Sequence, residues 1–430
     1  MHSQQNSNFI SHRKDHFARL FPELEPLELT DRQCWNYAER MMDWGEMENP
    51  DSSSITNGVA IFSQFLAHDI TFDANSRLRS SNRVPTIAND RTINLDLDCI
   101  YGQRTQDFYY DAEDKDKLLL GKHYEEEKRE WWDLQRNAQG KAIIADSRND
   151  ENILVSRQQV LFIAFHNAMV EHLRDTSCPD NVFAAARREV IWYYHWLILH
   201  EFLDPMLDPS IFNRLKREPA HHYRLPTALP LEFTGAAFRV GHSQTRDRNR
   251  INAQTDKKLF DLGFFSAMEE WVDWRYLFDF GDGRVQYARK LDTQIGRSFH
   301  CIPFIQTKDK KEQSLPFRNI RRGVSYGLPS GEAVAMRLGY EPLEVPLTKK
   351  LRLSGTPLWF YLLYEAETVG NAGEHLGPVG STILGECFMT IMREDEESFL
   401  KRYPRWRPEL GRNPHQFDFV DLIQFVEKYS

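Results

Sequence analysis

The stretch FSQFLAHDITFD places two polar side chains where both can reach the same bound molecule. Gln64 and His68 are four residues apart, so on a helix they point from one face, whereas Asp69 points elsewhere. A neutral imidazole can take up a proton and release it again near neutral pH, and a carboxylate can bind a cation. The stretch therefore predicts a polar pair in one cavity and a carboxylate in another.

Two more side chains could take part in such chemistry. His242 lies in FTGAAFRVGHS, a segment with helical character, and Arg148 lies in DSRNDEN, a turn-like stretch before a long helix. An arginine can stabilise developing negative charge without exchanging a proton. A single histidine on an apolar helix is most often a hydrogen-bonded core residue, so neither histidine indicates a site by itself.

The stretch RTINLDLDCIYGQ contains a second group of oxygen-bearing side chains. Thr92, Asn94, Asp96 and Asp98 alternate with other residues, and alternate residues of an extended chain lie on one side. Carboxylate, hydroxyl and carbonyl oxygens are the ligands that Ca²⁺ prefers. The motif D-x-D occurs on many protein surfaces and is weak evidence alone. A further carboxylate would strengthen the prediction of a calcium site, and Asp69 could supply it.

The dipeptide His68–Asp69 has an alternative interpretation as the metal-binding HD pair of phosphohydrolases. Such a site needs further histidine and aspartate ligands on neighbouring helices, and His166 and His172 in FHNAMVEH are candidates. It also needs a lysine or arginine to receive the phosphate, and it gives Gln64 no role.

The elements that must position these side chains are mainly helical. Apolar patterns predict helices over 57–70, 152–175, 185–207, 231–244, 267–279 and 380–395, with Pro205 ending the third. Strand signals are few and no repeat period occurs, which predicts a mainly α fold with little β. Residues 1–50, which contain several prolines, are predicted as a loosely ordered lead-in to a single domain over 51–430. The charged residues 104–140 are predicted as a surface insertion.

Composition limits the function classes. The formal net charge of −9 argues against a nucleic-acid partner, and five scattered cysteines without a CxxC motif fit free thiols in a reducing compartment. The amino-terminal residues lack the apolar region of a signal peptide, and the apolar run 190–199 is about half the length of a bilayer span. We expect a protein without an integral membrane segment that is cytoplasmic, or exported without a cleavable signal peptide.

Taken together, these stretches resemble the animal-type haem peroxidases of the peroxidase–cyclooxygenase superfamily, collinearly over roughly residues 55–400, and the carboxy-terminal stretch is similar to bacterial members. FSQFLAHDITF is similar to the family's distal helix, RTINLDLDCIYG to its calcium loop, and DSRNDEN to the segment of its catalytic arginine. LFIAFHNAMVEHL is similar to the H-N-R-x-A helix, FTGAAFRVGHS to the proximal helix, and LPFRNIRRGVSYGLP to the N-I-Q-R-G-R-D-H-G-L-P stretch. The resemblance implies a mainly α animal haem peroxidase-like fold with haem b and Ca²⁺.

The resemblance also implies roles for single residues. His68 would be the distal acid and base, Arg148 the catalytic cation, and Gln64 would hold the distal water or a small anion. His242 would bind the haem iron and Asn319 would accept its second N–H, which favours a strongly oxidising iron because an amide is less electron-donating than a carboxylate. The remaining haem contacts and calcium ligands implied are Arg239 and Arg322 at the propionates, Glu151 for one ester link, and Asp69, Thr92, Asn94, Asp96 and Asp98 for calcium.

The implied function is a peroxidase, which reduces hydrogen peroxide and oxidises a small anion (halide or thiocyanate) or a phenolic or organic donor through a ferryl intermediate. A fatty-acid or specialised-metabolite dioxygenase is the alternative. Such enzymes of the superfamily carry a radical tyrosine three residues before the proximal histidine, where this chain has Arg239, although Tyr326 could substitute. A haem-binding relative without turnover is a third possibility.

This chain departs from the family at several positions. Ala67 stands where mammalian members carry a first haem-linking carboxylate, and Asn152 stands at the position of their haem-linking methionine. At most one ester link, through Glu151, is therefore expected. Tryptophans such as Trp131, Trp132, Trp192 and Trp271 could carry radicals to the surface, although core packing is the expected role of most of them.

Overall fold

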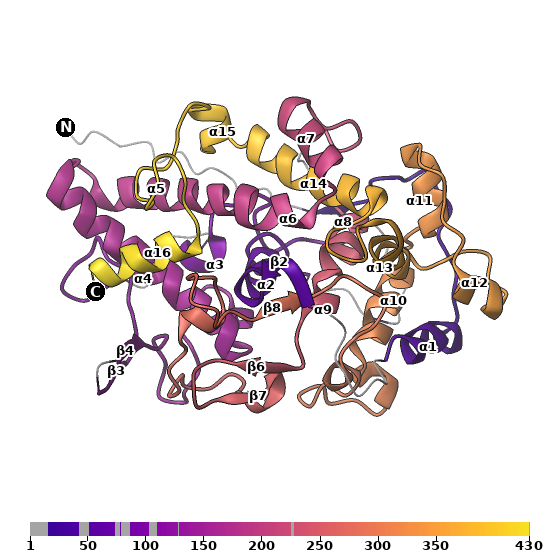
Figure 1. Ribbon diagram of the computed structural model, residues 1–430, viewed down its shortest axis with the longest axis horizontal. Helices are drawn as coiled ribbons and strands as arrows, with labels where there is room; N and C mark the ends of the chain where they lie inside the picture. Colours follow the sequence, from indigo (N-terminus) through magenta and orange to yellow (C-terminus); the bar gives the residue numbers. More distant parts are fainter. Residues whose placement is uncertain are drawn as a thin grey trace, which may run out of the picture.

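The computed structural model describes residues 16–42, 51–73, 78, 87–102, 110–127, 129–224 and 228–429. The chain is mainly helical, as predicted (Figure 1). Three of its long helices are α4 (Ile153–Thr176), α5 (Val182–Leu197) and α14 (Pro378–Glu394), and α2 (Asn57–Ile70) lies in the middle of the view. Helices α2, α4 and α14 confirm the helices predicted over 57–70, 152–175 and 380–395.

Helix α2 is held in the centre by its cap and by aromatic packing. The Thr56 hydroxyl accepts a hydrogen bond from the first turn, as a good amino-terminal cap does. Phe62 and Phe65 are fully buried and stack on Phe162 of α4, with ring centroids 6.0 and 5.0 Å apart. Tyr194 of α5 meets both phenylalanines edge-on. The helix that carries Gln64 and His68 is therefore fixed by large apolar contacts on two sides.

Shorter elements complete the fold. The other helices are α1 (Asp31–Arg40), α3 (Asp98–Tyr101), α6 (Asp204–Met206), α7 (Pro209–Arg217), α8 (Leu231–Gly235), α9 (Gly241–Gln244), α10 (Leu315–Ser325), α11 (Gly331–Leu338), α12 (Pro346–Leu351), α13 (Leu358–Val369), α15 (Phe399–Arg402) and α16 (Phe419–Lys428). The strands pair in two-stranded sheets: β1 (Phe17–Ala18) with β5 (Leu229–Pro230) in parallel, and, antiparallel, β2 (Asp51–Thr56) with β8 (Tyr287–Arg289), β3 (His123–Glu126) with β4 (Arg129–Trp132), and β6 (Arg248–Arg250) with β7 (Asp256–Lys258). None of the described helices is both long enough and apolar enough to cross a bilayer.

The predicted loose lead-in is wrong for residues 16–42. Phe17 and Phe21 are buried, and β1 pairs with β5 from a segment more than 200 residues away. Helix α1 packs on α10, and its Tyr37 is fully buried with its hydroxyl 2.7 Å from Thr348 Oγ1. These residues belong to the main core, whose apolar contacts outweigh the local effect of the prolines. The remaining lead-in residues, 1–15 and 43–50, lie outside the described ranges, as do 103–109 and 128 of the charged stretch.

Two predicted helices are corrected and a third is modified. Residues 231–244 break into α8, the 3₁₀ turn Ala237–Arg239 and α9, because Ala236 has a non-helical backbone with φ −138°. Residues 267–279 contain only the 3₁₀ turn Trp274–Tyr276, since aromatic and β-branched residues are weak helix formers and Asp273 starts a tight turn by accepting the Arg275 N–H. The helix over 185–207 continues past Pro205 to Met206 through a π-helical segment, Ile198–Leu203, which accommodates the proline.

Candidate active site

One cavity of about 260 Å³ gathers most of the predicted site residues. Its wall comes from α2, from the 3₁₀ turn Ser147–Asp150 with the residues after it, from the α8–α9 segment and from apolar residues between 259 and 315. Asn319, Arg322 and the predicted calcium ligands are not part of this wall. Six predicted residues line the cavity: Gln64, His68, Arg148, Glu151, Arg239 and His242.

A chain of buried amides fixes the proton on His68. The Asn149 Nδ2 donates to Gln159 Oε1 at 2.7 Å, and the Gln159 Nε2 donates to the Cys99 carbonyl at 3.0 Å. Asn149 Oδ1 is therefore the atom that faces His68, and it accepts the Nδ1–H at 2.7 Å. The lone pair of His68 is left on Nε2. Burial, and next the charge of Arg148, lower the pKa of His68 to about 3, so its ring is neutral at physiological pH.

Arg148 is held beside the carboxyl end of α2. Its Nε donates to Asp146 Oδ1 at 3.0 Å, and its Nη2 donates to the carbonyls of His68 and Thr71 at 3.0 and 2.7 Å. The guanidinium also lies over the Phe72 ring, 4.7 Å from its centroid. Every described contact is with a fixed group, so a permanent positive charge is positioned next to the imidazole.

Gln64 and Glu151 contact each other across the same cavity. The Gln64 Nε2 donates to Glu151 Oε2 at 3.3 Å, and burial raises the pKa of Glu151 to about 7 although Arg148 lowers it. Asn152, also in the wall, accepts the N–H groups of Leu154 and Val155 and caps α4. A methionine at that position could not form this cap, which gives the departure from the family pattern a local structural reason.

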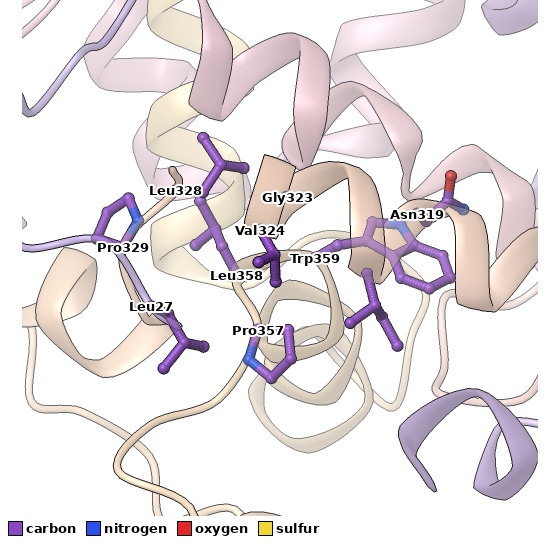
Figure 2. Close-up of a pocket in the computed structure, with 10 residues that line it drawn as sticks. Leu27, Asn319, Gly323, Val324, Leu328, Pro329, Pro357, Leu358 and Trp359 are labelled. Carbon is purple, nitrogen blue, oxygen red and sulfur yellow. The ribbon is translucent and has the colours of Figure 1, made fainter. Parts of the chain in front are cut away.

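His242 reaches the cavity from α9 and contacts Asn319 of α10. The Asn319 Nδ2 lies 2.8 Å from His242 Nδ1, and the Arg239 Nη1 donates to Asn319 Oδ1 at 3.5 Å. Figure 2 shows Asn319 and Trp359 at one end of an apolar cluster to which Leu27, Val324, Leu328, Pro329, Pro357 and Leu358 contribute. The cavity within that cluster measures about 10 Å³, so no ligand fits behind Asn319. The Trp359 Nε1 donates to the Arg239 carbonyl at 3.0 Å and fixes the turn before His242.

Positive charge gathers on the His242 side of the cavity. Arg239 donates through Nε to the Thr234 carbonyl at 2.8 Å, and both of its hydrogen-bond acceptors among the described residues are neutral. Burial lowers the pKa of Arg239, and the neighbouring Arg322 and Arg318 lower it further. Arg322 lies 3.8 Å from Asp73 and stacks over Tyr326, outside the cavity wall. This charge suits an anionic group inside the cavity, such as a haem propionate.

The oxygen-bearing loop lies on another side of α2, as the sequence predicts. The fully buried Asp69 carboxylate accepts hydrogen bonds from the Leu97 and Cys99 N–H groups and from the Tyr194 hydroxyl. The Thr92 hydroxyl donates to Asp96 Oδ1, and the Thr92 N–H donates to Asp98 Oδ2, both at 3.0 Å. Burial and the adjacent Asp98 raise the pKa of Asp69 and of Asp96.

These carboxylates do not form a ready-made metal site. Within the part of the chain that the structure describes, no three His, Cys, Asp or Glu side chains are arranged to hold a metal ion. No hydrogen bond from the Asn94 side chain is recorded within the loop, and Leu97 has the left-handed φ of 59°. The loop has the donor chemistry that calcium requires and is held closed by its own hydrogen bonds.

The two histidines proposed for the phosphohydrolase alternative have other contacts. His166 lies 3.0 Å from the Tyr101 hydroxyl and 3.0 Å from the Asp116 carbonyl, and His172 lies 3.1 Å from the Tyr429 hydroxyl. Neither lines the cavity of His68. The structure therefore gives no support to an HD-type metal site.

Several residues of the site were missed by sequence reasoning. Asn149 directly follows Arg148, and Gln159 is a polar residue inside an apolar helix, which was the available signal for a buried hydrogen-bond chain. Four phenylalanines line the outer part of the cavity with ring centroids 5.2–6.2 Å apart: Phe260, Phe264, Phe299 and Phe304. Their irregular sequence spacing gave no helical or strand pattern.

Comparisons with known proteins find similarity to haem peroxidases. A model of the animal haem peroxidase family matches residues 79–270. Chorion peroxidase of Drosophila melanogaster is 27% identical over 313 residues, which cover 64% of this chain and 36% of that protein. The chain thus spans little more than a third of the length of this relative.

Solved structures with the same fold include both activities that the sequence leaves open. Peroxidase A from Dictyostelium discoideum superposes with a TM-score of 0.66 at 13% identity, covering 96% of this chain and 90% of that one. The fatty acid alpha-dioxygenase of Arabidopsis thaliana gives a TM-score of 0.60 at 16% identity, covering 90% and 73%. At these identities the likeness establishes the fold alone. The family match over residues 79–270, the relative and the fold all make this chain similar to the animal haem peroxidases.

Proposed function

We propose that this protein is a haem peroxidase that reduces hydrogen peroxide and oxidises a small reducing substrate. The observation that carries the proposal is the single cavity bordered by His68 and His242 from two different helices. Each ring has its Nδ1 next to an asparagine amide, and no described residue hydrogen-bonds to either Nε2. Two imidazoles prepared in this way suit a haem between them, one as iron ligand and one as acid and base.

The residues around the cavity fit haem b. His242 would bind the iron through Nε2, and the buried Arg239, whose hydrogen-bond acceptors are neutral, would pair with a propionate. Glu151 is the one carboxyl group of the cavity wall in a position matching a family ester link, and Ala67 and Asn152 exclude the other two links. Bound haem would supply the redox-active iron at which peroxide is reduced.

The chain's own groups would handle the protons. His68 Nε2 would take the proton from the peroxide oxygen that approaches the cavity centre and return it to the departing oxygen, which leaves as water. The departing oxygen gains negative charge, and the Arg148 guanidinium would stabilise it without a proton of its own. The amide chain through Asn149 and Gln159 would keep the lone pair on Nε2 throughout.

The donor is proposed to be organic rather than a halide. The phenylalanines at 260, 264, 299 and 304 line the cavity, and Phe304 is 41% exposed, so we propose an apolar path from the cavity to the surface. Such a path favours an aromatic or apolar donor over a hydrated anion.

A fatty-acid dioxygenase is the second candidate, favoured by the same apolar path. Against it, no tyrosine is among the described residues that line the cavity. Tyr326, the substitute considered from sequence, donates its hydroxyl to Asp73 Oδ2 at 2.6 Å and lies outside the wall. A radical on this tyrosine would have no described contact with a substrate in the cavity.

Calcium is proposed for the loop beside α2. The neighbouring Asp98 adds to burial in raising the pKa of Asp69 and of Asp96, and a cation would remove this repulsion. The further ligands proposed are the Thr92 hydroxyl and the Asn94 carbonyl.

The test is an absorption spectrum of the purified protein before and after hydrogen peroxide, followed by two assays. We expect a haem spectrum that changes with peroxide, guaiacol oxidation faster than bromide oxidation, and no oxygen uptake with linoleate. A colourless protein, after expression with ample porphyrin, overturns the proposal. Linoleate-dependent oxygen uptake without peroxide turnover establishes the dioxygenase instead.

A further inference from the structure

A second hollow, of about 310 Å³, shares no wall residue with the cavity described above. It lies where β4, α4, the segment 271–275 and the end of α16 meet, and Figure 1 shows the β3–β4 hairpin, α4 and α16 on the same side of the molecule. Four tryptophans line it: Trp131, Trp132, Trp271 and Trp274. Two of them come from one strand and two from the irregular segment that was predicted as a helix.

A buried guanidinium forms part of the wall. Arg157 of α4 is only 4% exposed, its Nη1 donates to the Trp132 carbonyl at 2.7 Å, and its Nη2 donates to the Glu270 carbonyl at 3.1 Å. Its Nε has no hydrogen-bond partner among the described residues, and no described carboxylate forms an ion pair with it. Burial lowers the pKa of Arg157 to about 9, which still leaves it positively charged at neutral pH. A buried cation with a free N–H calls for an anionic partner.

The acidic residues of this hollow do not supply that partner. Asp273 is held by Arg275 Nε at 2.8 Å and by Arg284 at 3.6 Å. Burial raises the pKa of Glu427 although the neighbouring Arg275 lowers it. Glu130 is exposed and lies 3.5 Å from His123. Among the charged residues that line the hollow, Arg157 is therefore the buried one without a described ion pair.

The tryptophan walls are fixed by neighbours. Trp131 stacks on Tyr124 with centroids 5.4 Å apart and planes 9° apart, and its Nε1 donates to the Met268 carbonyl. Trp132 packs on His123 at 4.4 Å, and Arg129 lies 4.5 Å over Trp271. Flat rings held in place present a ready-made surface for a planar ring.

We infer that this hollow binds a planar aromatic carboxylate, with the carboxylate at the Arg157 guanidinium and the ring against the tryptophans. The size of the hollow suits a one- or two-ring acid, and charge complementarity selects the anion over a neutral or cationic analogue. The inference does not depend on haem binding, because the two cavities have no wall residue in common.

The test uses three ligands with one ring system and different charge, titrated into the full-length protein by isothermal calorimetry. Indole-3-acetate is anionic, 3-methylindole is neutral and tryptamine is cationic. We expect indole-3-acetate to bind at least about 10-fold tighter than 3-methylindole, as a hydrogen bond to a charged group provides, and tryptamine to bind weakest. Equal affinities, or tightest binding of tryptamine, overturn the inference.

Two variants locate the binding. Arg157→Met should remove the preference for the acid while 3-methylindole binds as before, and Trp271→Ala should weaken all three ligands. Arg248→Met, which changes an exposed arginine outside the hollow, is the matched control and should change nothing. If Arg157→Met does not fold, judged by circular dichroism, the ligand series and Trp271→Ala still decide.

The haem spectrum separates this site from the proposed active site. It should stay unchanged while indole-3-acetate saturates the protein, because the acid binds away from His68 and His242. A spectral change with the same affinity as the calorimetric titration places the ligand in the other cavity and overturns the inference. A colourless protein refutes the haem proposal only, since the calorimetric comparison can be made on it in the same way.

Discussion

The two amide–imidazole pairs of the cavity differ in how firmly the amide is held. Asn149 is bonded at both ends, with Oδ1 at His68 and Nδ2 at Gln159, and each bond is 2.7 Å long. Asn319 presents Nδ2 to His242, and its Oδ1 receives only a 3.5 Å bond from Arg239. In this arrangement Asn319 donates to Nδ1, so the proton of the neutral His242 ring is on Nε2.

This difference sets the two sides of the cavity apart. The His68 side already has its acid–base tautomer, with the lone pair towards the cavity. For His242 to hold iron through Nε2, Asn319 would accept the Nδ1–H through Oδ1. A continuous helix of 14 residues carries His68, whereas His242 lies in the last of three short helical pieces, so its backbone is less firmly supported.

The largest expected effect is on the His242 side. His242→Ala removes the only protein bond to iron that we propose, and we expect the purified protein to lose its haem spectrum. His172→Ala changes a partly buried histidine outside the cavity and should keep the spectrum. An unchanged pigment in His242→Ala contradicts the proposed ligand.

On the other side, His68→Leu should leave the pigment in place and slow its reaction with peroxide. Loss of a general acid and base costs about 10²–10⁴-fold in rate. Stopped-flow absorbance after mixing with hydrogen peroxide measures it directly. A rate within about threefold of the parent would remove His68 from the mechanism.

Replacing the two asparagines by leucine compares the pairs themselves. Asn319→Leu deprives the iron ligand of its second partner and should weaken haem retention by about 10–100-fold, measured by transfer of haem to apomyoglobin. Asn149→Leu should leave haem retention close to that of the parent and slow only the peroxide reaction. Equal effects of both variants on haem retention would show that the two sides are not divided in this way.

The acid limb of the pH profile tests the neutral state of His68. Because its pKa lies at about 3, protonation of His68 should not slow the peroxide reaction from neutral down to about pH 4 and should slow it below that. Asn149→Asp places a carboxylate beside Nδ1, which favours the imidazolium and raises the pKa of His68 by about 1–3. Since the protonated ring cannot accept a proton, the acid limb should move upward by the same amount, and a downward or absent shift contradicts the assignment.

The sequence predicted correctly the positions of side chains on regular helices. It missed the features that depend on contacts between distant segments. Gln64 and His68 were placed correctly on one face because α2 is a regular helix with a strong apolar pattern. His242 was predicted to lie in one continuous helix, whereas residues 231–244 are interrupted at Ala236. Packing causes this interruption, and the sequence contains no proline there that would have predicted it. The roles of Asn149 and Gln159 could not be derived, since they arise from contacts between a turn and two helices.

The same limit explains the fold-level errors. Residues 16–42 look like a lead-in by composition, yet β1 pairs with a strand far along the chain and α1 packs on α10. The segment 267–279 has an apolar pattern at helical spacing, but its tryptophans turn towards β4 and α4 around the second hollow. A periodic pattern records which residues are apolar and leaves open which partner they meet.

The smallest predicted effect concerns calcium and extends the comparison to the loop beside α2. The Cys99 N–H donates to Asp69, and the Cys99 carbonyl accepts from Gln159, so the loop is joined through Asn149 to His68 and, among the described residues, has no comparable chain to His242.

Chelation should therefore slow the peroxide reaction while the haem spectrum persists, and it should lower the unfolding free energy by about 2–3 kcal/mol if the starting calcium concentration was about 100 times Kd. Asp98→Asn should reproduce the effect, and re-addition of Ca²⁺ should reverse only the effect of chelation. If a metal-free protein, verified by elemental analysis, keeps its peroxide rate and its melting temperature, the loop is a structural hydrogen-bonded turn and the distal side depends on Asn149 and Gln159 alone.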